Sequence, residues 1–347
     1  MNVVKYEGWD REYQNRKGEY DKVFERCMSS NHIEDVSFPD FGRKYSIPIA
    51  NATDGLHFSL KAYNIGPGDE VLVSDFSWIS TSSCILMSGA TPVFCDIDLD
   101  TYSLSLDSVK RMTSPKTKAL IYTHLFGNMA DVRPILDYCK ENNIIFIEDA
   151  AQAFGSCYEW QQAGTIGDCS IFSFNSTKVI AGINGGGLFL TDDKDTANHV
   201  SKISRHGNNE ILGYNSRMYL LNTEIIKLRL RYLNQYISSR QKVAKIYDEE
   251  LRNDVIVQDS HNGHTYHKYV IRFDHKDDRD RVWKQTGFKV HYPMTLSNSP
   301  IYKDVEYRKD NCINSDIAAD TVMSLPIHPF LTDNEIDSVI NHLLISN

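Results

Sequence analysis

The chain has 347 residues, which is long enough to bury a large core and to form two subdomains. Its hydrophobic content of 41% and charged content of 24% are those of an ordinary soluble globular protein. The net charge of −9 argues against a nucleic-acid partner, which requires a basic surface, and no apolar run reaches the ~20 residues of a membrane-spanning helix.

The first part of the chain alternates helix and strand signals. Residues 54–64 are predicted to form a helix that Thr53 or Asp54 caps and that ends near residues 66–68. Short apolar runs and helical stretches then follow one another to residue 191. The predicted strands are 71–74, 92–96, 119–124, 144–149, 169–174 and 187–191, and the predicted helices are 79–88, 106–112 and 132–142. This alternation predicts an α/β fold with a mostly parallel sheet covered by helices.

The composition changes after about Tyr214. From Met218 to about Arg252 the chain lacks proline and glycine, which predicts one long helix crossing to a smaller C-terminal α+β domain. The elements predicted there are a strand at 266–273, a helix at 276–285, a strand leading into 291–293 and a final helix at 333–345. The predicted domains are 1–214, with 1–40 as a helical arm, then the linking helix 215–252 and the small domain 253–347.

Asp149 and Lys178 follow two of the predicted strands. Asp149 ends the apolar run that begins at Ile144, and Lys178 comes shortly after the run at 169–174. Both can reach the carboxyl-terminal edge of a parallel sheet, where open α/β folds bind ligands. An amine and a carboxylate on one pocket suit pyridoxal phosphate, because the lysine forms a Schiff base and the acid keeps the pyridine nitrogen protonated.

The segments 148–152 and 173–178 closely resemble those of the DegT/DnrJ/EryC1/StrS family of sugar aminotransferases. The resemblance extends from about residue 6 to about residue 344. It implies fold type I of the pyridoxal-phosphate enzymes, which is like that of aspartate aminotransferase. It also implies that Lys178 carries the cofactor and then moves a proton, that Asp149 binds the pyridine nitrogen, and that Gln152 lies near the ring oxygen.

The phosphate of the cofactor is expected at the start of the helix that follows Asn51, because helix N-termini bind anions. The resemblance implies that Thr53, Asp54 and Ser173 contact it. Trp78 stands where the family stacks an aromatic ring on the pyridine ring. Two alternatives stay open, because Thr53 also suits a plain helix cap and Trp78 a core residue.

Residues 213–218 resemble the family's Gly-x-Asn-x-Arg-Met motif. In the family the asparagine that matches Asn215 reaches the phosphate from the neighbouring subunit. The resemblance therefore implies a homodimer with two shared active sites. Taken alone, Asn215 also suits a helix cap.

Candidate substrate contacts come from two segments. His291 and Tyr292 resemble a family motif near the substrate end of the pocket, although the histidine also suits a strand residue. Lys227 and Arg229 are candidates for binding the substrate diphosphate. Their spacing spreads them around a helix, so a solvated helix face is the alternative.

Three features depart from the family pattern. Asn184-Gly185 replaces an acid before the glycines, and Ser297 replaces a histidine. The loop 207–213 is shorter than usual. The spacing from Lys178 to the glycines is one residue longer than usual and resembles that of family members acting at C3 rather than C4.

The resemblance implies transfer of an amino group from L-glutamate to the keto group of a nucleotide-linked deoxysugar, in a pathway such as O-antigen or lipopolysaccharide synthesis. The expected nucleotide is dTDP, and UDP and GDP also stay open. One alternative is a dehydratase of the same family, which carries a histidine in place of the lysine. Another is a cofactor-free homologue that acts as a regulator or scaffold. Neither a metal nor a membrane partner is expected, and scattered cysteines without a CxxC motif suit a reducing cytoplasm.

Overall fold

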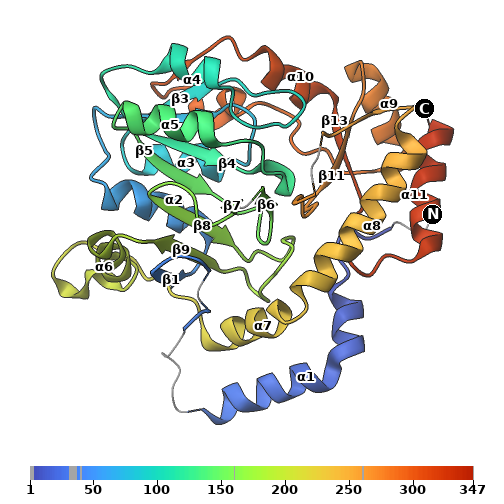
Figure 1. The fold of residues 1–347 in the computed structure, drawn as a ribbon, viewed down its shortest axis with the longest axis horizontal. Helices are drawn as coiled ribbons and strands as arrows, with labels where there is room; N and C mark the ends of the chain where they lie inside the picture. The colour runs from blue at the N-terminus through green and yellow to red at the C-terminus, as the bar shows by residue number, and fades with distance from the viewer. Residues whose placement is uncertain (1–3, 31–36, 40, 160, 260–261, 347) are drawn as a thin grey trace.

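The structure is a computed structural model that describes residues 4–30, 37–39, 41–159, 161–259 and 262–346 (Figure 1). Within these residues the predicted helical arm contains one helix, α1 (Trp9–Ser29), and the rest of that prediction lies partly outside the described residues. None of the described helices combines the length and the apolar character that crossing a membrane requires.

The described strands form one large sheet in the order β1-β9-β8-β5-β4-β2-β3-β12. The neighbours from β8 to β12 run parallel, whereas β9 runs antiparallel to both β8 and β1. The mostly parallel sheet predicted from the alternating pattern is therefore confirmed. The strands are β1 (Tyr45–Ile49), β2 (Glu70–Ser74), β3 (Thr91–Cys95), β4 (Thr117–Thr123), β5 (Ile145–Asp149), β8 (Cys169–Ser173), β9 (Gly187–Thr191) and β12 (Arg308–Lys309).

Helices cover both faces of this sheet, which explains why its central strands carry apolar residues on both faces. Leu72 and Phe146 pack on one face against α4 (Leu106–Met112) and α5 (Arg133–Glu141). Val71 packs on the opposite face, because side chains alternate along a strand. The helices on that second face are α2 (Ala52–Ala62), α3 (Ser80–Met87) and α6 (Lys194–Ile203).

The cap predicted for α2 is wrong by two or three positions. The helix begins at Ala52, and Asn51 is its N-cap, with Oδ1 accepting a hydrogen bond of 2.9 Å from the backbone N–H of Asp54. Asn51 takes the cap because its backbone is still extended, so its side chain can fold back onto the first turn.

The single long helix predicted over 218–252 is also wrong. The structure has α7 (Leu220–Leu230) and α8 (Leu233–Leu251), and the chain changes direction between them (Figure 1). No proline or glycine marks the break, so its cause is packing. Leu228 of α7 packs on α1, whereas Tyr247 of α8 packs in the core of the C-terminal part.

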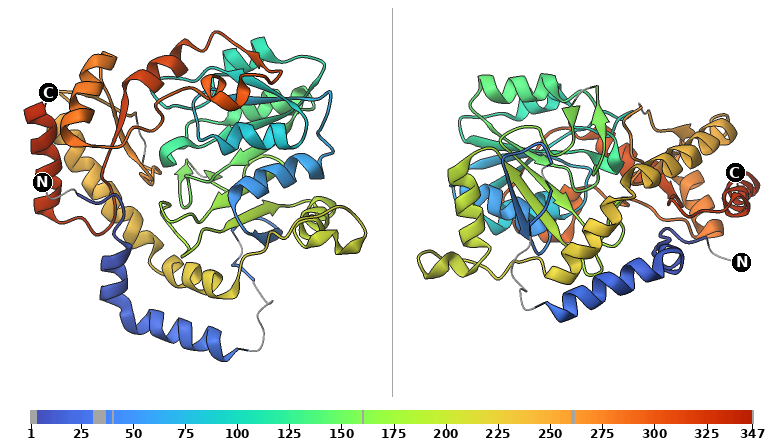
Figure 2. Two further views of the ribbon diagram at one scale, coloured as in Figure 1. Left: turned by 180° about the vertical axis from the view of Figure 1, so that it is seen from behind. Right: turned by 60° about the horizontal axis from the view of Figure 1, so that its bottom comes forward.

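A second sheet, β10 (Ile256–Val257), β11 (Tyr269–Arg272) and β13 (Val322–Leu325), packs with α8, α9 (Lys276–Thr286) and α11 (Asp333–Ser346) beside the large sheet (Figure 2). The predicted helices 276–285 and 333–345 are confirmed. The strand predicted at 266–273 is shorter, because Tyr266 has a left-handed backbone with φ 48°. The strand expected before residue 291 is reduced to one bridge between Lys289 and Ser324.

Short elements complete the described chain. Residues 300–321 return to the large sheet, where β12 pairs with β3 before α10 (Ile313–Thr321) leads into β13. The domain boundaries proposed from the sequence stay predictions. The remaining short elements are β6 (Cys157–Tyr158), β7 (Gln161–Gln162) and the 3-10 turns Leu125–Gly127, His206–Asn209, Leu296–Asn298 and Pro300–Tyr302.

Candidate active site

A cavity of about 410 Å³ opens at the carboxyl ends of β5 and β8, where the sequence pattern places a ligand site. It brings together eight of the predicted site residues from segments far apart in the sequence. They are Thr53, Trp78, Asp149, Gln152, Ser173, Lys178, His291 and Tyr292. The acid and the amine identified from the sequence therefore share one compartment.

Asp149 lies at the end of β5 and is buried, with 4% of its surface exposed. Its carboxylate accepts hydrogen bonds from the backbone N–H of Ala151 at 3.1 Å and from the hydroxyls of Thr81 at 3.2 Å and Thr123 at 3.3 Å. Burial raises the pKa of this carboxyl group, and within the described residues no cation lies within ion-pair distance of it. A buried acid of this kind is costly without a positive partner, so the cavity suits a cationic group such as a protonated pyridine nitrogen.

Lys178 reaches the same cavity from the loop that follows β8. Burial lowers the pKa of its amine to about 8, and the charge of Asp149 acts in the opposite direction. The loop is tight, because a Cβ atom at Gly187 would lie 2.5 Å from the backbone of Asn51, and Gly186 has a φ of 130°. Close packing of backbone around the lysine explains why glycines follow it.

The start of α2 forms another wall of the cavity, through Asn51, Ala52 and Thr53. Free N–H groups and the helix dipole make a helix N-terminus a suitable site for a phosphate. Ser173 lines the cavity near it, as predicted. Asp54 does not line the cavity: its carboxylate accepts hydrogen bonds from Ser216 at 2.6 Å and from Asn51 at 3.0 Å.

The aromatic side of the cavity contains Trp78 and Tyr292, whose ring centres lie 5.9 Å apart. Trp78 is 55% exposed and is therefore not a core residue. Gln152 donates a hydrogen bond of 3.1 Å to the hydroxyl of Tyr292 and accepts one of 3.0 Å from the backbone N–H of Phe126. These bonds fix Gln152, and burial raises the pKa of Tyr292, so that its hydroxyl stays protonated.

His291 lies beside these aromatic residues. Its Nδ1 atom is hydrogen-bonded to the hydroxyl of Ser324 at 2.9 Å. Burial lowers the pKa of the imidazole to about 3, so the ring is neutral at physiological pH. The histidine can therefore form hydrogen bonds in the cavity but carries no positive charge there.

Lys227 and Arg229 lie outside the cavity, which corrects their assignment to the substrate diphosphate. Lys227 pairs with Glu224 at 2.9 Å on α7. The Arg229 guanidinium is buried against α1, where its Nε lies 2.9 Å from a carboxylate oxygen of Glu12 and its centre lies 4.1 Å from the Trp9 ring. The solvated alternative is wrong for Arg229, because α1 covers this face of α7.

Asn215 is exposed and does not line the cavity of its own chain. It forms an isolated bridge with Arg205. Its contribution to the site of a neighbouring subunit stays a prediction.

The sequence interpretation missed two lysines of the cavity, Lys268 and Lys289, and the buried His267. The sequence signal that could have indicated them is the pair His267 and Lys268 directly before the apolar strand at 269–272. Of the departures from the family pattern, Gly185 lines the cavity, whereas Ser297 donates two hydrogen bonds to the buried Asp75, at 2.7 Å and 2.8 Å.

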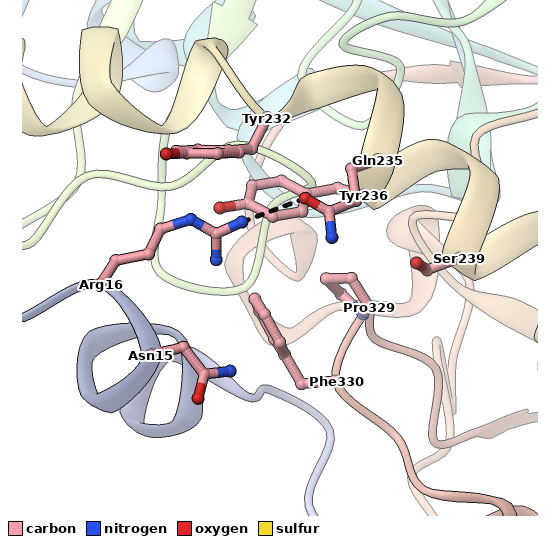
Figure 3. Close-up of a pocket in the computed structure, with 8 residues that line it drawn as sticks. All are labelled: Asn15, Arg16, Tyr232, Gln235, Tyr236, Ser239, Pro329 and Phe330. Carbon is pink, nitrogen blue, oxygen red and sulfur yellow. Dashed lines mark hydrogen bonds between the residues drawn. The ribbon is translucent and has the colours of Figure 1, made fainter.

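A second cavity of about 400 Å³ lies between α1, α8 and the segment at 329–330 (Figure 3). There the guanidinium of Arg16 stacks over the Tyr232 ring at 3.7 Å and donates a hydrogen bond of 3.0 Å to Gln235. This cavity contains none of the predicted site residues.

Residues 16–344 match the family model described as the DegT/DnrJ/EryC1/StrS aminotransferase family. The chain belongs to this family. The match confirms the resemblance seen in the sequence, the aminotransferase class and pyridoxal phosphate as the family cofactor.

Similar members of the family carry different names. A UDP-2-acetamido-2-deoxy-3-oxo-D-glucuronate aminotransferase of Pseudomonas aeruginosa is 34% identical over 309 residues, covering 86% of this chain and 85% of that protein. A pleiotropic regulatory protein of Geobacillus stearothermophilus is 32% identical, covering 86% of this chain and 84% of that protein. The solved structure of S. venezuelae DesV shares the fold, with a TM-score of 0.90 at 24% identity and coverage of 99% and 98% of the two chains. The predicted fold class is thereby confirmed.

Proposed function

We propose that this family member transfers an amino group from L-glutamate to the C3 keto group of a nucleotide-linked sugar, with pyridoxal phosphate bound in the cavity of Asp149 and Lys178. The observation that carries the proposal is the shared cavity itself, which holds a buried acid and an amine with a lowered pKa. Perturbed groups of opposite charge in one cavity are typical of a catalytic site.

The residues of the cavity fit this cofactor in three places. Asp149 would pair with the pyridine nitrogen, the start of α2 with Thr53 and the hydroxyl of Ser173 would hold the phosphate, and Trp78 would cover the ring. When bound, pyridoxal phosphate supplies an electron sink next to the carbon that loses and regains a proton.

The proton itself is moved by Lys178. A pKa of about 8 leaves a fraction of this amine neutral at physiological pH, so that it can accept a proton and later return it. The burial of Asp149 strengthens the electrostatic interaction between its carboxylate and this amine. The neutral His291 and the protonated Tyr292 offer hydrogen bonds to the hydroxyl groups of a sugar.

The assignment to C3 is supported by the spacing between Lys178 and the glycine loop and by the 3-oxo sugar in the name of the Pseudomonas relative. The nucleotide expected from the resemblance is dTDP, whereas the name of that relative carries UDP. The product would serve a surface polysaccharide such as O-antigen, made in the cytoplasm.

The rival functions differ in what they require of the cavity. A dehydratase of this family carries a histidine at position 178, where this chain has lysine. A regulator without catalysis does not need a buried acid opposite an amine, although the Geobacillus relative bears a regulatory name. The presence of both Asp149 and Lys178 in one cavity favours the enzyme.

Incubation of the purified protein with pyridoxal phosphate, L-glutamate and a panel of 3-keto and 4-keto sugars linked to dTDP, UDP or GDP tests the proposal. We expect mass spectrometry to show an amino sugar from a 3-keto substrate and to show 2-oxoglutarate in equal amount. Amination of 4-keto sugars alone would contradict the C3 assignment. A deoxygenated product without nitrogen would identify the dehydratase.

We also propose a homodimer in which Asn215 completes the site of the neighbouring subunit. Lys178→Ala and Asn215→Ala proteins should each be nearly inactive, and mixing them after mild dissociation should restore activity. Equal mixing should recover about a quarter of the wild-type activity, because half of the dimers are mixed and each contains one intact site. Recovery does not occur if Asn215 acts within its own subunit.

A further inference from the structure

Two lysines enter the cavity from the C-terminal part of the chain. Lys268 precedes β11 and is 7% exposed, with its backbone N–H bonded to the carbonyl of Phe126 at 3.2 Å. Lys289 lies next to β13, through its bridge with Ser324. Both line the same cavity as Lys178, but they come from other segments of the fold.

The two amines have few partners of opposite charge. Within the described residues no acceptor lies within hydrogen-bonding distance of the Lys268 amine. The Lys289 amine lies 3.8 Å from a carboxylate oxygen of Glu7 and 4.4 Å from the centre of the Tyr6 ring. One carboxylate therefore faces two lysines on this wall, and only Lys268 of the two is buried, because 46% of the Lys289 side chain is exposed.

In the part of the chain that the structure describes, the positive charges of Lys268 and Lys289 are not balanced by negative charges on this side of the cavity. A buried ammonium group is costly unless an anion or several acceptors satisfy it. The charge of Asp149 acts on Lys178 but not on Lys268, whose one acidic neighbour among the described residues is Glu7. The excess of positive charge beside Lys178 therefore suits a negatively charged group on the molecule that reacts there.

We propose that Lys268, supported by Lys289, binds a carboxylate of the reacting substrate, and that this contact determines which donors or sugars the enzyme accepts. The inference rests on the proposed function and deepens it. An ammonium–carboxylate bond desolvated in this way is among the stronger hydrogen bonds in proteins.

The size of the cavity favours a carboxylate over the nucleotide diphosphate. The cofactor and the reacting part of the substrate have to share about 410 Å³, so a nucleoside with its diphosphate has to extend beyond the cavity. A carboxylate lies close to the reacting carbon in an amino acid and also in a sugar acid. Both sources offer the same chemistry to Lys268.

Binding of glutarate, an unreactive dicarboxylate, to the protein loaded with pyridoxal phosphate tests the contact without catalysis. We expect Lys268→Met, which keeps the volume of the side chain, to weaken glutarate binding in calorimetry at least tenfold, as expected for loss of a charge-assisted bond worth ~1.4 kcal/mol or more. Lys268→Arg should retain most of the affinity. Lys245→Met, which removes an exposed lysine of α8, is the matched control and should bind as the wild type does.

The pH dependence of glutarate affinity provides a second test of the same contact. Burial lowers the pKa of Lys268 to about 7, Glu7 opposes this shift, and the charges of Lys178, Lys289 and Arg240 add to it. Because only the charged amine binds an anion, glutarate affinity should fall as the pH rises through about 7. The Lys268→Met protein should lack this part of the pH dependence.

Kinetic measurements with the two substrates of Lys268→Met, the amino donor and the keto sugar, identify which of them carries the carboxylate. Weaker saturation by L-glutamate in the first half-reaction of Lys268→Met would assign the contact to the donor. Weaker saturation by a keto sugar acid, but not by its neutral counterpart, would assign it to the sugar. Either result supports the inference.

Unchanged glutarate binding in Lys268→Met, with the cofactor still bound, would overturn the inference and leave the proposed function standing. Loss of the cofactor from Lys268→Met but not from Lys268→Arg would also overturn it, because Lys268 would then serve the cofactor. A wild-type protein that takes up no cofactor would instead refute the proposed function.

Discussion

Lys178→Ala is expected to abolish transamination and the absorption band of the Schiff base between Lys178 and the cofactor. General acid–base catalysis alone contributes about 10²- to 10⁴-fold, and this variant also loses the covalent attachment, so the rate should fall by at least that factor. The measurement is single-turnover conversion of L-glutamate to 2-oxoglutarate, together with an absorption spectrum. Turnover at the wild-type rate would defeat the assignment of Lys178.

The fold of Lys178→Ala should remain intact, because the side chain opens onto the cavity rather than packing in the core. Its denaturant midpoint without cofactor is therefore expected to match that of the wild type. Lys245→Ala serves as the matched control, since it removes an exposed lysine that does not line the cavity. That protein should keep both the absorption and the activity.

Asp149→Asn is expected to weaken cofactor binding and turnover together. A hydrogen bond to a charged partner contributes about 1.5–3 kcal/mol, which corresponds to about a 10- to 100-fold increase in the dissociation constant of the cofactor. Equilibrium titration with pyridoxal phosphate measures the first effect and steady-state kinetics at saturating cofactor the second. Unchanged values would show that the pyridine nitrogen has another partner.

The same substitution should affect the cofactor-free protein in the opposite direction. Burial raises the folded-state pKa of Asp149 above 3.8, so the stabilising effect of its protonated form is lost as the pH rises through the raised pKa. Asparagine stays neutral throughout. Without cofactor, the unfolding free energy of Asp149→Asn relative to wild type should therefore increase between pH 4 and neutral pH. A relative stability that falls over this range would contradict the account of a buried, unpaired acid.

The large sheet could be predicted because its signals are local. The strands β2, β3, β4, β5, β8 and β9 are short apolar runs, and the helices between the first of them have their own periodicity and stop signals, so this part of the order follows from pattern. The edge strands β1 and β12 were not predicted. The break between α7 and α8 could not be predicted in this way, since residues 231–232 contain no helix breaker. It arises because Leu228 and Tyr247 pack against different parts of the fold.

In the cavity, too, the residues with local sequence signals could be predicted, whereas those placed by long-range packing could not. Asp149 and Lys178 were found because they end or follow buried strands, and parallel strands bring their carboxyl ends together. Lys268 was missed because its position depends on how the C-terminal part folds back onto the large sheet. Arg229 was misplaced for the converse reason: its partner Glu12 is far away in the sequence, and nothing in the spacing on α7 indicates that α1 covers it.

The most direct test of the account identifies the amine that holds the cofactor. Three lysines line the cavity, namely Lys178, Lys268 and Lys289. Borohydride reduction of the protein loaded with pyridoxal phosphate, followed by proteolysis and mass spectrometry, locates the modified lysine. We expect the added mass on the peptide that contains Lys178; modification of Lys268 or Lys289 in its place would contradict the account.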